Sequence, residues 1–332
     1  MRILKFGGSS VADAGQLKNV SAIVKTYISR SPDLVMVVSA QSGVTDDLVK
    51  LCSIIPIDFS ACEPILTHIA QRHVATLKEL LPALQQPAAL AEVLSLCKEL
   101  NDIAKGASLV GEVTARTRDL ILSFGERLSA FCVSAVFKLE IPNIHFADAR
   151  NLIRTDETFG YAKVNFTETN KRVQEYFAAN KGLQVVTGFI ASSESGQTTT
   201  LGRSGSDYTA AILGAALTAE AIEIWTDVDG VMTADPRFVQ EAQHIEQLSY
   251  SEAMELSHFG AKVIFPATMQ PAMVKSIPIW VKNTFNPTFK GTLICDTTGA
   301  DNGFVKGITS LKTLRLDTPM KKCRLQPKTE LK

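Results

Sequence analysis

The chain has 332 residues, of which 45% are hydrophobic and 20% charged, and this balance excludes a wholly disordered polypeptide. Lysine plus arginine number 34, as do aspartate plus glutamate, so no net charge favours nucleic acid or an acidic membrane surface as a partner. The longest apolar run, from Leu34 to Val38, is much shorter than the roughly 20 residues of a membrane-spanning helix. The six cysteines show no metal-ligand spacing, and we expect reduced thiols in a cytoplasmic protein.

Segments typical of strands and of helices alternate along the chain, and this alternation predicts an α/β layered fold. A short strand over residues 3–6 leads into a pair of glycines, and a helix is expected over residues 13–30. The apolar run from Leu34 to Ala40 predicts a buried parallel strand. The chain is then mostly helical from residue 46 to 139, with one helix expected over about 124–138.

The second half of the chain returns to strands with shorter helices between them. A helix of small residues is expected from Asp207 to Leu217, and Ser249 to Glu252 matches a capping box before a helix that ends at Gly260. Further strands are expected over residues 144–146, 183–190, 221–225, 277–282 and 292–294. The segment from Lys312 to Lys332 is rich in lysine and arginine, and it is either a disordered basic terminus or part of a chain cut short.

The segment from Lys5 to Ser10 lies between a predicted strand and a predicted helix. Its glycines, Gly7 and Gly8, allow a tight turn whose N–H groups face an anion, and Lys5 at the strand end can reach the same anion. The segment has neither the Walker A order nor the GxGxxG spacing. From the spacing alone, both phosphate binding and a plain tight turn stay open.

The segment from Ser39 to Thr45 follows the predicted buried strand and is rich in hydroxyl groups. In open parallel sheets, ligands collect at the carboxyl ends of the strands, so Ser39, Ser42 and Thr45 would line a pocket there. A hydroxyl-rich turn without a ligand is the commoner explanation of such a segment.

Glu126, in the segment from Phe124 to Ser129, is expected near the start of an otherwise apolar helix. A glutamate in the first turn usually interacts with the positive end of the helix dipole. Without further context, this structural role is the favoured one for Glu126.

The segment from Thr198 to Asp207 is the strongest candidate for a ligand site. Gly202 and Gly205 permit a close approach of the backbone to a ligand, and Arg203 offers a fork suited to a carboxylate or a phosphate. Either Ser206 or Asp207 is expected to cap the helix that follows.

Two later segments carry charge beside a predicted strand or helix end. The one from Trp225 to Arg237 combines three aspartates with an arginine, but it lacks the ligand spacing of an EF-hand loop. Lys262 stands just past the expected helix end at Gly260, where it would either meet a phosphate or favour the helix C-terminus.

Taken in this order, the segments resemble those of the aspartokinases, within the amino-acid kinase superfamily. They look most like the kinase part of aspartokinase–homoserine dehydrogenases, and the single-function aspartokinases are close. The matching segments, within residues 1 to about 295, are KFGGSS (5–10), VVSAQSGVT (37–45), GERLS (125–129), TTTLGRSGSDYTAA (198–211), IWTDVDGVMTADPR (224–237) and AMELSHFGAKVIFPAT (253–268).

The resemblance implies a three-layer αβα sandwich with a mainly parallel central sheet. Residues 1–295 would form the catalytic domain, with an aspartate-binding lobe to about 195 and a nucleotide-binding lobe over about 196–295. Residues 296–332 would be a flexible linker and the truncated start of a regulatory ACT domain. We therefore expect no complete feedback inhibition by lysine or threonine, and a homo-oligomer in the full-length protein.

The resemblance also implies ATP-dependent phosphorylation of the L-aspartate side chain to 4-phospho-L-aspartate, the first step towards lysine, threonine and methionine. Mg²⁺ would bridge the ATP phosphates, and no residue is assigned to it directly. The acceptor carboxylate is ionised at pH 7, so no general base is needed. Catalysis would rest on positioning and on charge stabilisation.

The family likeness assigns roles residue by residue. Lys5 would stabilise the transferring phosphoryl group, Arg203 would hold the aspartate α-carboxylate, and Glu126 its ammonium group. The catalytic residues would be Lys5 and Asp207. The aspartate site would comprise Ser39, Thr45, Glu126, Arg203 and Ser206. The nucleotide site would comprise Lys5, Gly7, Gly8, Ser9, Thr226, Asp227, Met232, Arg237 and Lys262.

Two residues depart from the family pattern. Met232 stands where a tyrosine is usual, and Phe265 where a histidine is usual, which leaves the charged groups in place. Another amino-acid kinase, acting on glutamate, N-acetylglutamate or UMP, is the first alternative function. A truncated fragment that only binds nucleotide is the second. Glu126 and Arg203 together favour a free amino acid as substrate.

Overall fold

The computed structural model describes residues 1–234, 239–258 and 265–296. Arg237, Lys262, the expected end of a helix at Gly260 and the segment 297–332 lie outside these residues. The expectations placed on them therefore stay predictions.

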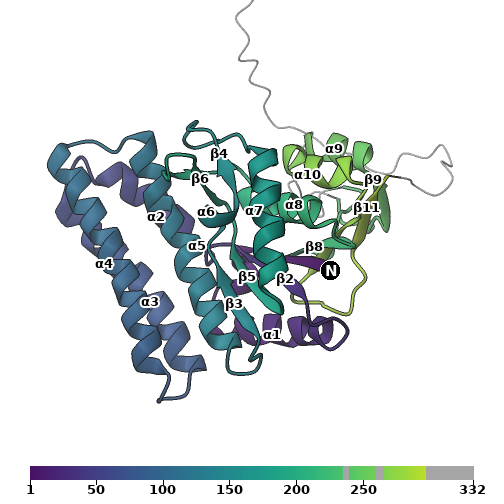
Figure 1. Ribbon diagram of the computed structural model, residues 1–332, viewed down its shortest axis with the longest axis horizontal. Coiled ribbons are helices and arrows are strands. Elements are labelled where there is room, and N and C mark those ends of the chain that lie inside the picture. The colour runs from purple at the N-terminus through teal and green to yellow at the C-terminus, as the bar shows by residue number, and fades with distance from the viewer. Residues whose placement is uncertain (235–238, 259–264, 297–332) are drawn as a thin grey trace, which may run out of the picture.

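A mostly parallel sheet forms the centre of the molecule (Figure 1), and its strand order is β3-β5-β2-β1-β8-β10-β11-β9. Within the described residues, β10 and β11 are the antiparallel neighbours in this sheet, and the other adjacent pairs are parallel. The strands are β1 (Arg2–Phe6), β2 (Leu34–Val38), β3 (Ile144–Ala147), β5 (Leu183–Thr187), β8 (Ala221–Thr226), β9 (Gln247–Ser249), β10 (Ile279–Asn283) and β11 (Thr292–Cys295).

Helices cover both faces of this sheet, which confirms the predicted three-layer αβα sandwich. Side chains of a strand alternate between the faces. Ile3 of β1 therefore packs in the core that includes α8, whereas Leu4 and Phe6 pack in the core that includes α1. The longer helices are α1 (Ala14–Ile28), α2 (Val44–Ile54), α3 (Glu63–Leu80), α4 (Gln86–Val110), α5 (Ala115–Phe137), α7 (Phe166–Ala179), α8 (Gly205–Leu217), α9 (Tyr250–His258) and α10 (Pro266–Val274).

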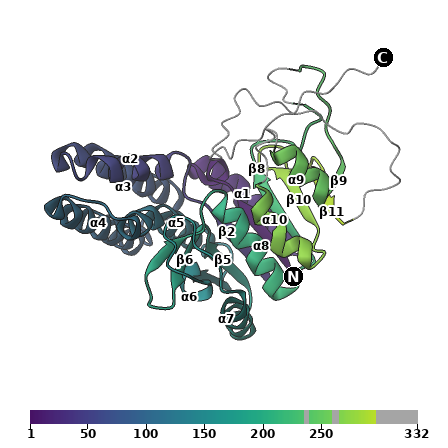
Figure 2. The ribbon, with the colours of Figure 1, turned by 90° about the horizontal axis from the view of Figure 1, so that it is seen from above.

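The helices α2 to α4 extend sideways from the sheet (Figure 2) and share an apolar core with α5, whose later residues also pack in the core on one face of the sheet. The shorter elements are η1 (Gly8–Val11), η2 (Phe59–Cys62) and α6 (Ala149–Leu152), with a small sheet of order β4-β6-β7 made by β4 (Arg154–Thr155), β6 (Ile190–Ser193) and β7 (Thr198–Thr200). The large sheet contains strands from before and after residue 195, so it does not separate the two predicted lobes. The division into lobes near that residue stays a prediction.

Helix α5 differs from the helix expected over 124–138, because it begins at Ala115. The hydroxyl of Thr114 accepts a hydrogen bond from the backbone N–H of Thr117 and so caps the earlier start. Glu126 consequently lies in the middle of α5, and the expected interaction with a helix N-terminus is wrong. By length and composition α5 is apolar enough to cross a membrane, but most of its apolar stretch is buried against the rest of the protein, as in a core helix.

The capping box predicted at Ser249 to Glu252 is confirmed. The backbone N–H of Glu252 donates to Ser249 Oγ at 3.1 Å, and the backbone N–H of Ser249 donates to Glu252 Oε2 at 2.7 Å. These reciprocal bonds satisfy two donors at the start of α9 that the helix itself leaves unpaired.

Replacing Ser249 with alanine should lower the free energy of unfolding by about 1 kcal/mol, because the cap of α9 is lost. Urea unfolding followed by circular dichroism measures this change. Ser251→Ala is the matched control, because it makes the same substitution at an exposed residue of the first turn. Equal losses in the two variants would contradict the capping role.

Candidate functional site

The predicted site residues begin to converge at the carboxyl ends of three adjacent parallel strands. Strand β1 pairs with β2 on one side and with β8 on the other, and Phe6 lies opposite both Val38 and Trp225. The loops that follow these strands start at Gly7, Ser39 and Asp227, so they begin at one edge of the sheet. This edge is where open parallel sheets bind their ligands.

The glycine turn after β1 is hydrogen-bonded to β8 on one side and to the loop after β2 on the other. The backbone N–H of Gly7 donates to Trp225 O at 3.0 Å, and Ser42 N–H donates to Gly8 O at 3.1 Å. A Cβ atom on Gly8 would lie 2.7 Å from Ala40 O, so no larger residue fits there without movement. The turn continues into η1, and α1 begins only at Ala14. The predicted glycine turn is therefore confirmed, but it does not open directly into the long helix.

Lys5 and Asp207 form an ion pair between the end of β1 and the first turn of α8. Lys5 Nζ lies 2.6 Å from Asp207 Oδ1, and each side chain is only 11% exposed. The residue that caps α8 is Ser204, which has a φ of 54° and makes no side-chain hydrogen bond to the helix. The expectation that Ser206 or Asp207 caps α8 is therefore wrong, and Asp207 instead faces Lys5.

Glu126 lies buried beside the same loops, with 4% of its surface exposed. Its Oε1 accepts a hydrogen bond from Ala40 N–H at 3.1 Å, while Oε2 has no hydrogen-bond partner among the described residues. Burial raises the pKa of Glu126 to about 8, although the Ala40 N–H and the charge of Lys5 act to lower it. A buried carboxyl group with one oxygen that has no hydrogen-bond partner is suited to bind a cation.

Arg203 is exposed, and its guanidinium carbon lies 5.7 Å from the centre of the Phe265 ring. The two residues share a cavity of about 220 Å³ with Tyr161, Leu201 and Tyr208 among its lining residues. Within the described residues, no hydrogen bond or ion pair joins Arg203 to Lys5 or Glu126. Phe265, where the resemblance leads us to expect a histidine, is thus a direct neighbour of the arginine expected to bind substrate.

The remaining predicted residues surround this arrangement. Thr226 ends β8, and its hydroxyl donates to Asp227 Oδ1 at 3.1 Å. Ser206 is buried close to Gly188, where a Cβ atom would lie 2.5 Å from Ser206 Oγ. Ser9, Ser39, Thr45 and Met232 are half-buried, with Thr45 in the first turn of α2 and Met232 bridged through its backbone to His244.

Two residues near the site were not predicted from the sequence. Arg72 of α3 donates from Nη1 to Ser42 O at 2.5 Å and from Nη2 to Ala12 O at 3.1 Å, so it joins the loops that follow β1 and β2. Asp119 of α5 is fully buried. No local motif marks Arg72, whereas Asp119 is an acidic residue two helical turns before Glu126 in an apolar helix, which is a usable signal.

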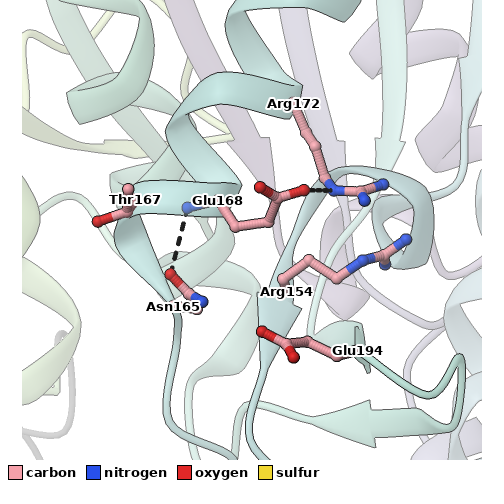
Figure 3. A pocket seen from close by; sticks show the side chains of 6 residues that line it. All are labelled: Arg154, Asn165, Thr167, Glu168, Arg172 and Glu194. Atoms are coloured by element: carbon pink, nitrogen blue, oxygen red, sulfur yellow. Dashed lines mark hydrogen bonds and ion pairs between the residues drawn. The ribbon is translucent and has the colours of Figure 1, made fainter.

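A cavity of about 390 Å³ at the start of α7 (Figure 3) has none of the predicted site residues in its lining. Glu168 Oε1 accepts a hydrogen bond from Arg172 Nε at 2.5 Å. The lining residues are Arg154, Asn165, Thr167, Glu168, Arg172 and Glu194. Two arginines and two glutamates cancel in formal charge, and none of these residues was predicted for the site, so this cavity is not the candidate active site.

Comparison with known proteins finds close relatives. The bifunctional aspartokinase/homoserine dehydrogenase of Buchnera aphidicola subsp. Acyrthosiphon pisum (strain APS) is 34% identical over 321 residues, which cover 95% of this chain and 39% of that protein. The lysine-sensitive aspartokinase 3 of Escherichia coli (strain K12) is 34% identical over 299 residues, covering 89% of this chain and 64% of the relative.

Among solved structures, E. coli aspartokinase III in complex with aspartate and ADP (R-state) matches with a TM-score of 0.82 at 33% identity. The match covers 90% of this chain and 65% of that chain. The chain thus spans less than two thirds of the length of these three proteins.

The family model described as "Amino acid kinase family" matches residues 1–283. That range extends from the first residue to the last residue of β10 and includes all the predicted site residues, from Lys5 to Lys262. The chain belongs to the amino acid kinase family.

Proposed function

We propose that the chain carries an aspartate kinase site, which transfers the γ-phosphoryl group of ATP to the side-chain carboxylate of L-aspartate. The observation that carries this proposal is the buried Lys5–Asp207 ion pair next to Glu126, whose second carboxyl oxygen has no partner among the described residues. The similarity to an aspartokinase III structure that contains aspartate and ADP supports the same reaction.

The chemistry suits these groups. The acceptor carboxylate is already an anion and needs no general base, but it has to approach a polyphosphate of the same charge. Lys5, at the end of β1, would leave Asp207 in part to stabilise the negative charge on the transferring phosphoryl group. Glu126 would bind the substrate ammonium group and Arg203 its α-carboxylate, which fixes the side-chain carboxylate for attack.

Mg²⁺ would accompany ATP, and it would supply charge neutralisation on the phosphate oxygens. The described residues contain no cluster of three His, Cys, Asp or Glu side chains placed to hold a metal. We infer that phosphates and water would hold most of the coordination positions of the ion, as is common for Mg²⁺ in kinases.

A coupled assay of ADP release with ATP, Mg²⁺ and a panel of acceptors tests the proposal. Aspartate should give clear turnover, with glutamate, N-acetylglutamate and UMP each at least tenfold lower in kcat/KM. N-Acetylglutamate lacks the ammonium group that Glu126 would bind, so it serves as the structural control. No aspartate-dependent release, or a better rate with another acceptor, would overturn the proposal.

Lys5→Ala should lower kcat roughly 100-fold or more and change the KM for aspartate much less, because the lysine acts on charge that develops in the transition state. Steady-state kinetics in both substrates measure the two effects separately. Lys18→Ala is the control, since Lys18 forms an exposed ion pair with Glu79. An unchanged kcat in Lys5→Ala would remove this residue from the mechanism.

The KM for aspartate should fall as the pH rises from 6 to 8. Burial raises the pKa of Glu126 to about 8, so below that pH the free site is mostly protonated and must lose a proton to bind an ammonium group. The fall should approach tenfold per pH unit at the acid end. Glu126→Gln should bind aspartate weakly at every pH and lose this dependence, and a wild-type KM that is flat across the range would refute the role.

A further inference from the structure

Asp119 is a buried carboxylate for which the proposed chemistry has no use. It lies on α5, two helical turns before Glu126, and its side chain is 0% exposed. Among the described residues it forms no ion pair. Burial raises the pKa of Asp119, while its hydrogen bonds and the nearby charge of Arg118 act to lower that pKa. A buried carboxylate without an ion-pair partner requires well-placed hydrogen-bond donors.

Those donors come from two segments that are distant in the chain. Asp119 Oδ2 accepts from the backbone N–H of Gly160 at 2.9 Å and from that of Thr200 at 2.8 Å. Asp119 Oδ1 accepts from Thr200 Oγ1 at 3.0 Å. The two segments also bond to each other, because Ala162 N–H donates to Thr200 O at 3.0 Å. Asp119 therefore fastens both the loop around Gly160 and the strand β7 to helix α5.

The residues next to these donors form the wall of the Arg203 cavity. Tyr161 follows Gly160 and Leu201 follows Thr200, and both line that cavity. The ring of Tyr161 is also packed on Gly202, where a Cβ atom would lie 2.3 Å from Tyr161 Cδ2. The backbone that leads into Arg203 is thus confined between Tyr161 and the hydrogen bonds of Thr200.

We propose that Asp119 is a positioning residue that fixes the wall behind Arg203 and thereby sets the affinity for the substrate α-carboxylate. This inference rests on the proposed function. Helix α5 would then carry both Glu126, for the ammonium group, and the anchor of Arg203, for the carboxylate. One rigid helix would define the spacing between the two ionic groups that an α-amino acid presents.

Kinetics of Asp119 variants test this role. Asp119→Ala should raise the KM for aspartate at least tenfold, as Arg203→Ala should, while the KM for ATP changes less than about twofold. Asp119→Asn should have a smaller effect, because the amide retains one acceptor oxygen. Val93→Ala, in the buried core of α4, is the control for lost stability alone and should leave the KM for aspartate unchanged.

A double-mutant cycle separates positioning from general damage. Thr200→Val removes the hydroxyl that donates to Asp119, so its effect on the aspartate KM should be less than additive with that of Asp119→Asn. Strict additivity, or equal increases in the KM values for aspartate and ATP, would overturn the proposal.

Hydrogen–deuterium exchange provides a readout that does not depend on turnover. Peptides covering residues 158–163 and 198–205 should exchange faster in Asp119→Asn than in the wild type, while peptides from β5 should not. If the wild type fails to phosphorylate aspartate, the proposed function falls, and the exchange measurement still decides whether Asp119 holds this wall. Unchanged exchange in both segments would overturn the inference whatever the activity.

Discussion

The ion pair between Lys5 and Asp207 is the contact on which the geometry of the site depends. It joins the end of the central strand β1 to the first turn of α8, and both side chains are only 11% exposed. A buried charge that loses its partner is strongly destabilising, so each residue constrains the position of the other. Because β1 lies between β2 and β8, the loops that follow all three strands begin at the edge of the sheet where Lys5 lies.

Helix α5 is the second element that fixes the geometry of the site, because it is buried and passes close to the loop that follows β2. A Cβ atom on Gly125 would lie 2.8 Å from the Cβ of Ala40, so only glycine allows this approach. The approach brings Glu126 within hydrogen-bond distance of Ala40 N–H. The carboxyl group is thereby enclosed by apolar helices instead of water, and this enclosure accounts for its raised pKa.

The sheet, and the gathering of several candidate residues at one edge of it, could be predicted from sequence because their signals are local. Apolar runs such as LVMVV mark buried parallel strands, and the glycines and charged residues that follow them mark a shared edge. The cap at Ser249 is equally local. The position of Glu126 in its helix was not predicted, because the helix start depends on a single hydroxyl at Thr114. Arg72 and Asp119 were missed because their partners are distant in sequence and become neighbours only through the fold.

The contact between Phe265 and Arg203 bears on which N–H groups of that arginine can bind a ligand. The face of an aromatic ring attracts a guanidinium group but offers no hydrogen-bond acceptor. A ring at 5.7 Å can therefore support the cation without occupying any of its N–H groups. A neutral histidine ring, by contrast, carries a nitrogen that can accept a hydrogen bond. Among the described residues, the contact with Phe265 thus leaves the fork of Arg203 available for an incoming anion.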